Sequence, residues 1–173
     1  MSIGWRDLAF QPDPDTARDA AAAWAWLVPP PWTQVLCSMI GGIFLEKPDG
    51  TVHWLDTGTG MIEPVAGTRA EFEAALASSP DRVEEWFLPG LVERLHAAGK
   101  RPADGQCFGF TILPIFREGG FESGNMRVVP VREQLLGTAE IHRQLSALPD
   151  GTRVRFKVVD WPCGAPAPRP LPA

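Results

Sequence analysis

The sequence has few of the residues that build disulfide scaffolds or metal sites. The three cysteines lie far apart, at Cys37, Cys107 and Cys163. An odd number without CxxC spacing predicts neither a disulfide framework nor a zinc knuckle, and a reducing compartment fits it best. The three histidines lie at His53, His96 and His142, without HxH or HExxH spacing. We therefore expect no metal and no cofactor.

The sequence also lacks a basic surplus and a long apolar run. Its net charge is −5 and its pI is about 5.2, whereas a nucleic-acid binder usually carries a basic patch. No apolar run approaches the ~20 residues that span a bilayer. The first residues lack the basic and apolar regions of a signal peptide. These absences predict a cytoplasmic protein that binds neither nucleic acid nor membrane, and its acidity would suit a basic partner.

Two apolar segments joined by strong turn signals form the most informative stretch, from Gly41 to Gly60. Pro48 presets φ, Asp49 can bond its own backbone, and Gly50 accepts a positive φ. The stretch predicts a β-hairpin closed by a second turn over residues 57–60, with a third short strand over residues 61–65. The run Gly58-Thr59-Gly60 lacks GxGxxG and a Walker lysine, which favours a plain turn over a phosphate site.

The remaining pattern predicts an α+β fold, with a mixed, mostly antiparallel sheet packed against several helices in a single domain. We expect a helical segment over 1–35, an α+β domain over 36–160 and a Pro-rich tail over 161–173. Helix starts are predicted at Asp13-Pro14, at a Thr68–Glu71 capping box and at Ser79-Pro80. Further helices are predicted over 89–98 and 133–148, and strands over 106–115, 126–131 and 153–159; residues 32–40 fit either type.

The helical and strand spacings also predict a core. Its expected members are Trp54, Phe72, Trp86, Leu91, Leu95, Phe108, Ile141 and Leu145. Trp24 and Trp26 are two residues apart on a predicted helix, so they cannot both face this core. We expect one of them to be half-exposed.

Two groups of residues are candidates for function. Cys107 and His142 could form a nucleophile–base pair, which needs a positioned base and a third orienting group. Cys107 lies in an apolar strand pattern, which favours a buried structural thiol. His142 lies on a predicted helix and could simply form a hydrogen bond at the surface of the domain. The second group is an acidic surplus on the central helices, with Glu71, Glu73, Glu84 and Glu85 as candidate partner-binding residues. Such a surplus usually marks a solvated face, but it could also steer a basic partner.

Several segments, taken in order, resemble one bacterial domain. They are Trp54–Gly60, Glu84–Pro89, Gly105–Phe110, Ile141–Leu145 and Leu148–Thr152, with Gly119-Gly120-Phe121 and Asn125 between them. The domain was once catalogued as one of unknown function. It is named for the C-terminal part of immunity proteins that protect type VI secretion bacteria from their own DNase effectors. The resemblance covers about residues 42–159, and residues 1–35 show no clear match to the module often found ahead of this domain.

The resemblance implies a non-enzymatic cytosolic protein that neutralises a toxic, DNase-like effector by binding it. The alternative is a small hydrolase or ligand-binding domain with a cleft near Cys107 and His142. A short contact between these two side chains inside a concave pocket would favour the alternative.

Overall fold

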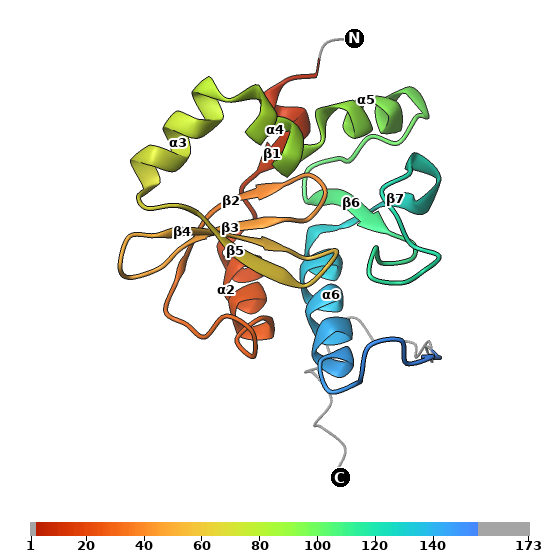
Figure 1. Ribbon diagram of the computed structural model, residues 1–173. Helices are drawn as coiled ribbons and strands as arrows, with labels where there is room; N and C mark the ends of the chain where they lie inside the picture. The colour runs from red at the N-terminus through yellow and green to blue at the C-terminus, as the bar shows by residue number, and fades with distance from the viewer. Residues whose placement is uncertain (1–2, 156–173) are drawn as a thin grey trace.

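The computed structural model describes residues 3–155 of the chain as an α+β domain with helices on both faces of one sheet (Figure 1). Every described strand pair is antiparallel. The five-stranded sheet has the order β1-β2-β3-β4-β5, and β6 and β7 form a second, two-stranded sheet. Neighbours in sequence are therefore neighbours in the sheet, as short turns favour.

The element bounds follow the chain order. The strands are β1 (Ala9–Phe10), β2 (Thr33–Ser38), β3 (Ile43–Glu46), β4 (Val52–Asp56), β5 (Met61–Ala66), β6 (Gln106–Phe110) and β7 (Met126–Pro130). The helices are α1 (Trp5–Leu8), α2 (Pro14–Ala23), α3 (Arg69–Ser78), α4 (Pro80–Phe87), α5 (Pro89–Ala97), the 3-10 turn η1 (Ser123–Asn125) and α6 (Val131–Leu145).

The predicted hairpin is confirmed as β3 and β4, and its turn uses the expected chemistry. Gly50 has a φ of +84°, and the Asp49 carboxylate accepts a hydrogen bond from the Thr51 N–H at 3.0 Å. The second turn ends at Gly60, with a φ of +71°, and leads into β5. Both turns form as predicted because the conformation of each depends on only two or three adjacent residues.

The helix caps were mostly predicted correctly. The Asp13 carboxylate accepts from the Thr16 N–H at 2.9 Å, and the Thr68 hydroxyl accepts from the Glu71 N–H at 3.2 Å. The reciprocal half of the capping box differs from the prediction. The Glu71 carboxylate accepts from the Gly67 N–H rather than from Thr68 itself, so this side chain secures the residue ahead of the cap.

The core lies on both faces of the five-stranded sheet because side chains alternate along each strand. On β3, Phe44 faces the side covered by α3, α4 and α5, while Ile43 and Leu45 face α2 and α6. Trp24 joins the second side, where its indole N–H donates to the Leu135 carbonyl at 3.0 Å. The segment 1–35 therefore contributes to the sheet and to the core, since it also holds β1 and the start of β2.

The core prediction is confirmed for most of its members. The fully buried ones are Phe72, Trp86, Leu91, Leu95 and Phe108, whereas Trp54, Ile141 and Leu145 are only partly buried. Trp24 is completely buried and Trp26 is half-buried, which matches the expected outcome. The expected reason was wrong, because α2 ends at Ala23 and both tryptophans lie in the turns that follow it.

Two expected boundaries were wrong: β6 ends at Phe110 instead of residue 115, and α6 starts and ends earlier than predicted. Residues 32–40, which fitted either type, contain the strand β2. The final strand, expected over 153–159, is not formed by residues 153–155, and the rest of it lies outside the described residues. In the part of the chain that the structure describes, no helix is long and apolar enough to cross a membrane.

Candidate functional site

The loop between β6 and β7, residues 111–125, is held by hydrogen bonds between the Asn125 side chain and the loop backbone. The Asn125 side chain donates to the carbonyls of Ile112 and Gly120, both at 2.8 Å, and accepts from the Ile112 N–H at 3.0 Å. A Cβ on Gly119 would lie 2.0 Å from the Leu113 carbonyl oxygen, so only glycine fits there. The strand ends at Phe110 because these bonds turn the chain away from β7.

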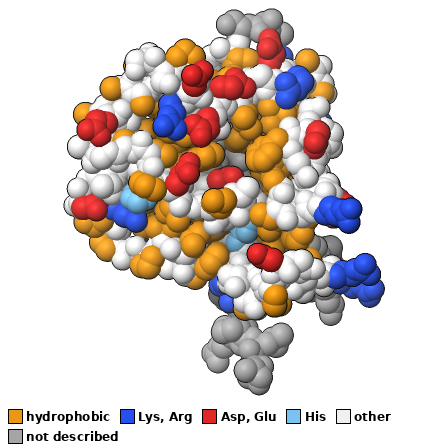
Figure 2. Space-filling view, viewed as in Figure 1, with side chains coloured by type: hydrophobic (Ala, Val, Ile, Leu, Met, Phe, Trp, Pro, Cys, Tyr) orange, Lys and Arg blue, Asp and Glu red, His pale blue; other side chains and the backbone are white. Residues whose placement is uncertain are grey.

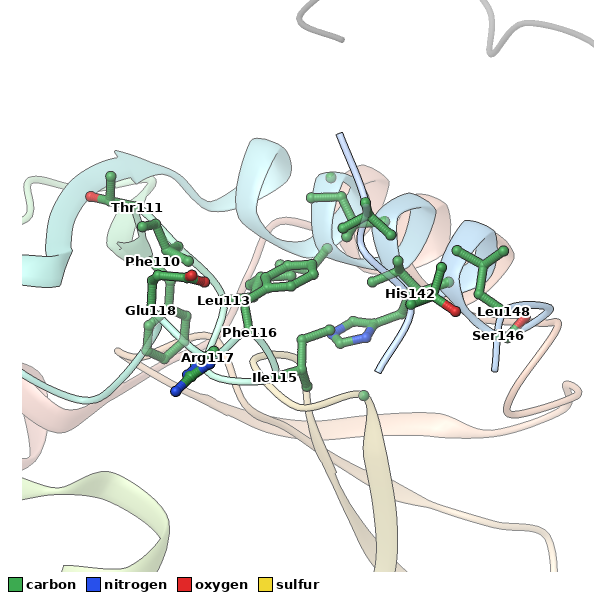
Figure 3. Close-up of a pocket in the computed structure, with 18 of the residues that line it drawn as sticks. Phe110, Thr111, Leu113, Ile115, Phe116, Arg117, Glu118, His142, Ser146 and Leu148 are labelled. Atoms are coloured by element: carbon green, nitrogen blue, oxygen red, sulfur yellow. The ribbon is translucent and has the colours of Figure 1, made fainter. Parts of the chain in front are cut away.

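This loop and α6 form the two walls of a groove, which we call the α6 groove. Figure 3 shows Leu113, Ile115 and Phe116 on the loop side and His142 and Leu148 on the helix side. Residues 149–154 also line the groove, and its volume is about 1500 Å³. The walls are largely apolar, and Ile115 and Leu148 remain about 40% exposed at the rim.

The floor of the α6 groove is polar. Gln134, Thr138 and His142 are four residues apart on α6, so they lie on one face of the helix, and all three are buried. The Thr138 hydroxyl donates to the Gln134 carbonyl at 2.6 Å. The Gln134 Nε2 has no hydrogen-bond partner among the described residues. Burying an amide N–H without a hydrogen-bond partner reduces the stability of the fold, so packing alone does not explain a glutamine at this position.

His142 is held by the turn that follows β4. Its Nε2 lies 3.0 Å from the Thr57 carbonyl oxygen. Because a carbonyl can only accept, Nε2 carries the proton in the neutral ring, and Nδ1 is an acceptor. Burial lowers the pKa of His142, and its contacts with the Thr57 and Gly58 backbone and the Asp56 charge oppose that shift. The possible surface role for His142 is therefore wrong, since the side chain is 94% buried.

Glycines on other segments allow Gln134 and His142 of α6 to pack closely against them. A Cβ on Gly60 would lie 2.7 Å from Nδ1 of His142, and one on Gly109 would lie 2.6 Å from Oε1 of Gln134. Gly41 faces Gln134 in the same way, at 3.0 Å. Three of the segments quoted for the resemblance, Trp54–Gly60, Gly105–Phe110 and Ile141–Leu145, therefore meet here, and close packing accounts for Gly60 and Gly109.

Cys107 has the properties of a structural thiol. It is completely buried among apolar side chains, and this burial raises its pKa to about 12. Between residues 3 and 155, no hydrogen bond connects Cys107 with His142. The structure therefore does not bring the proposed nucleophile and base together. The described residues also contain no group of three or more His, Cys, Asp or Glu side chains that could hold a metal ion.

The four acidic candidates lie on α3 and α4. Glu71, Glu73, Glu84 and Glu85 are all exposed. The basic side chains of these helices are engaged nearby: Arg69 lies 3.2 Å from Glu73 and 3.6 Å from Glu46. Arg82 lies 2.9 Å from Glu85 and over the ring of Trp86. In Figure 2, acidic side chains outnumber basic ones over this part of the molecule.

A shallow groove lies beside the acidic helices, and we call it the Trp5 groove. It has a volume of about 630 Å³ and is lined by Trp5 and Phe10 on one side and by Glu73 and Leu76 of α3 on the other. Trp5 is 49% exposed and packs edge-on against Phe87. Trp5 could not be singled out from the sequence, because its exposure depends on where α1 lies in the assembled fold.

Comparison with known protein families and with curated proteins finds no relative of this chain. No protein-family model matches the chain, and no curated protein matches it either. The resemblance to the immunity domain therefore stays a prediction.

Proposed function

We propose that this protein is a non-enzymatic binding protein that neutralises a toxic effector by direct contact, in the manner of a type VI secretion immunity protein. The observation that carries the proposal is the exposed acidic surface of α3 and α4 beside the half-exposed Trp5. The resemblance stated above supplies the class of partner, a DNase-like effector, and DNA-cutting proteins are expected to carry a basic surface.

The charges of the acidic surface support this partner. Both arginines of α3 and α4 already pair with carboxylates of the chain, so they neutralise only part of the surface. Glu84 and Asp81 add to the remaining negative charge. Complementary charge steers encounter and raises the association rate. Tryptophan is enriched among the residues that dominate binding energy, and Trp5 is accessible at the edge of this surface.

The buried thiol argues against the hydrolase alternative. A nucleophilic cysteine needs access and thiolate character, and Cys107 has neither. The ligand-binding form of the alternative keeps one observation in its favour, the α6 groove beside His142.

The first experiment tests the role itself. Cells that express an effector encoded beside this gene should survive only when this protein is co-expressed. Purified protein should bind the same effector tightly and with slow dissociation, because neutralisation depends on long residence. Failure to protect against any neighbouring effector would contradict the proposal.

The second experiment tests the contact surface. The double variant Glu84→Gln with Glu85→Gln should slow association and flatten its salt dependence, because rim charges act mainly on the association rate. The control is Asp15→Asn with Glu140→Gln, which removes two charges from α2 and α6 on the other side of the sheet. Equal kinetics in the two double variants would exclude the α3–α4 surface and leave the role open.

A further inference from the structure

The α6 groove is separate from the acidic surface and carries exposed apolar side chains. Figure 1 shows α3 and α4 at one end of the five-stranded sheet and α6 with the 111–125 loop at the other. Ile112 and Ile115 line the groove from the loop, and Leu148 lines it just after α6. Each of the three is about 40% exposed. Exposed apolar surface that is gathered in one place marks an interaction site.

Charged side chains surround this apolar surface. Six of them line the groove, three of each sign: Arg117, Arg127, Arg153, Glu118, Glu133 and Asp150. All six are exposed, so they lie at the rim, whereas the lining residues Leu113 and Val129 are buried. A segment that fits this groove therefore has apolar side chains on one face and charged side chains on the other.

The chain itself supplies a segment at this place. Residues 149–154 line the groove, and residues 156–173 follow directly after the described part of the chain. Residue 156 is therefore only two residues away from the lining. The helix α6 has 15 residues and is about 22 Å long, so about seven extended residues span its length. The stretch 156–173 is longer than that and can reach across the groove.

The sequence of this segment has the two faces that the groove requires. Basic and apolar residues alternate in the order Arg153, Val154, Arg155, Phe156, Lys157, Val158. The described residues set the phase of this alternation. Val154 lines the groove and is half-buried, whereas Arg153 and Arg155 are exposed. Because successive side chains of an extended segment point to opposite sides, Phe156 and Val158 would share the side of Val154.

We propose that residues 156–158 continue across the α6 groove as an extended segment and cover it. Phe156 and Val158 pack against Ile115 and Leu148, and Lys157 lies on the charged side, near Glu118 of the rim. The occupant is this chain's own segment rather than a separate protein, because covalent attachment gives a short segment an effective concentration of about 1 mM. This proposal does not depend on the acidic surface or on the identity of an effector.

The first test measures how far the groove is protected in the full-length chain. In a Cys163→Ser background, the other two cysteines are completely buried, so a thiol added at the surface can be labelled selectively. Ile115→Cys places this thiol in the groove. The control is Met61→Cys, which replaces a 66% exposed residue outside the groove lining. The thiol of Ile115→Cys should be labelled at least tenfold more slowly than that of Met61→Cys.

Two neighbouring valines provide a matched pair of variants for the occupant. Val158 would face the groove, and Val159 would face away from it. Val158→Gln should raise the labelling rate of Ile115→Cys at least fivefold, because it places a polar side chain against an apolar wall. Val159→Gln makes the same change on the other face and should leave the rate unchanged. Labelling of Cys37 or Cys107 in either variant would report unfolding and identify a rate that does not concern the groove.

The second test detects the contact directly. The photo-reactive residue p-benzoylphenylalanine in place of Phe156 should cross-link within one chain to residues 112–118 or 141–148, as peptide mass spectrometry can show. The same residue in place of Val159 should give at least fivefold less of these products. The cross-links do not require the folded chain to be destabilised, so they keep the test independent of the labelling rates.

Three results would overturn the proposal. The thiol of Ile115→Cys is labelled as fast as that of Met61→Cys, Val158→Gln and Val159→Gln change its rate equally, or the residue at position 156 cross-links elsewhere in the chain. Cross-links between two chains, with protection that increases with protein concentration, would assign the groove to a second copy and would also contradict it.

Discussion

Replacing Gly60 with alanine should destabilise the protein much more than the same change at Gly50. Both glycines follow a strand in a tight turn, and their φ values are +71° and +84°. Alanine is strained by about 1–2 kcal/mol in this left-handed region. The two positions differ in what a Cβ would meet: nothing within 4 Å at Gly50, and the His142 ring at Gly60. The pair therefore separates backbone strain from crowding.

The size of the difference follows from the contacts of His142. A Cβ on Gly60 would lie 2.7 Å from Nδ1 and 2.9 Å from Cγ. The ring cannot easily retreat, because Nε2 is bonded to Thr57 and the ring packs against Trp24, with 5.8 Å between ring centroids. Overpacking of this kind costs ~1–3 kcal/mol. We expect a loss of about 1–2 kcal/mol for Gly50→Ala and about 2–5 kcal/mol for Gly60→Ala.

Urea unfolding and thermal unfolding measure both variants against the natural chain. For a protein of this length, 1 kcal/mol shifts Tm by ~2–4 °C, so Gly60→Ala should melt roughly 2–12 °C below Gly50→Ala. Equal losses in the two variants would refute the reasoning, since they would show that His142 does not pack against Gly60.

Four further measurements test local parts of the structure. In a Cys163→Ser background, a thiol reagent at neutral pH should label Cys107 only as fast as the chain unfolds, and rapid labelling of the folded protein would contradict its burial. Burial lowers the pKa of His142 below its ordinary 6.5, so the unfolded chain takes up the proton first and stability should fall as the pH drops below about 6.5. His142→Gln should reduce that loss of stability when unfolding curves are measured from about pH 8 to about pH 5. The same dependence of stability on pH in the variant and the natural chain would contradict this prediction. Asp13→Ala removes the α2 cap and should cost ~1 kcal/mol in urea unfolding, and no loss would mean that the cap bond is not formed. Gly137→Ala, whose Cβ would meet nothing within 4 Å on α6, should raise the free energy of unfolding by about 0.5–1 kcal/mol, and a loss would indicate crowding there.

The local features of the fold were readable from the sequence. The hairpin turn at Asp49 and Gly50 and the caps at Asp13 and Thr68 each depend on residues close in the chain. Their geometry is set by backbone preferences and short-range hydrogen bonds, which adjacent residues specify on their own. The α+β class followed from the order of these elements.

The candidate sites required the tertiary structure. The four-residue spacing of Gln134, Thr138 and His142 was visible in the sequence, but their burial depends on the turns at Gly41 and Gly60, which lie far away in the chain. The separation of Cys107 from His142, the end of β6 at Phe110 and the exposure of Trp5 likewise depend on long-range packing. Periodicity indicates which side chains share a face of a helix or strand. Only the assembled fold determines what that face contacts, because a contact between two distant segments depends on the positions of both segments.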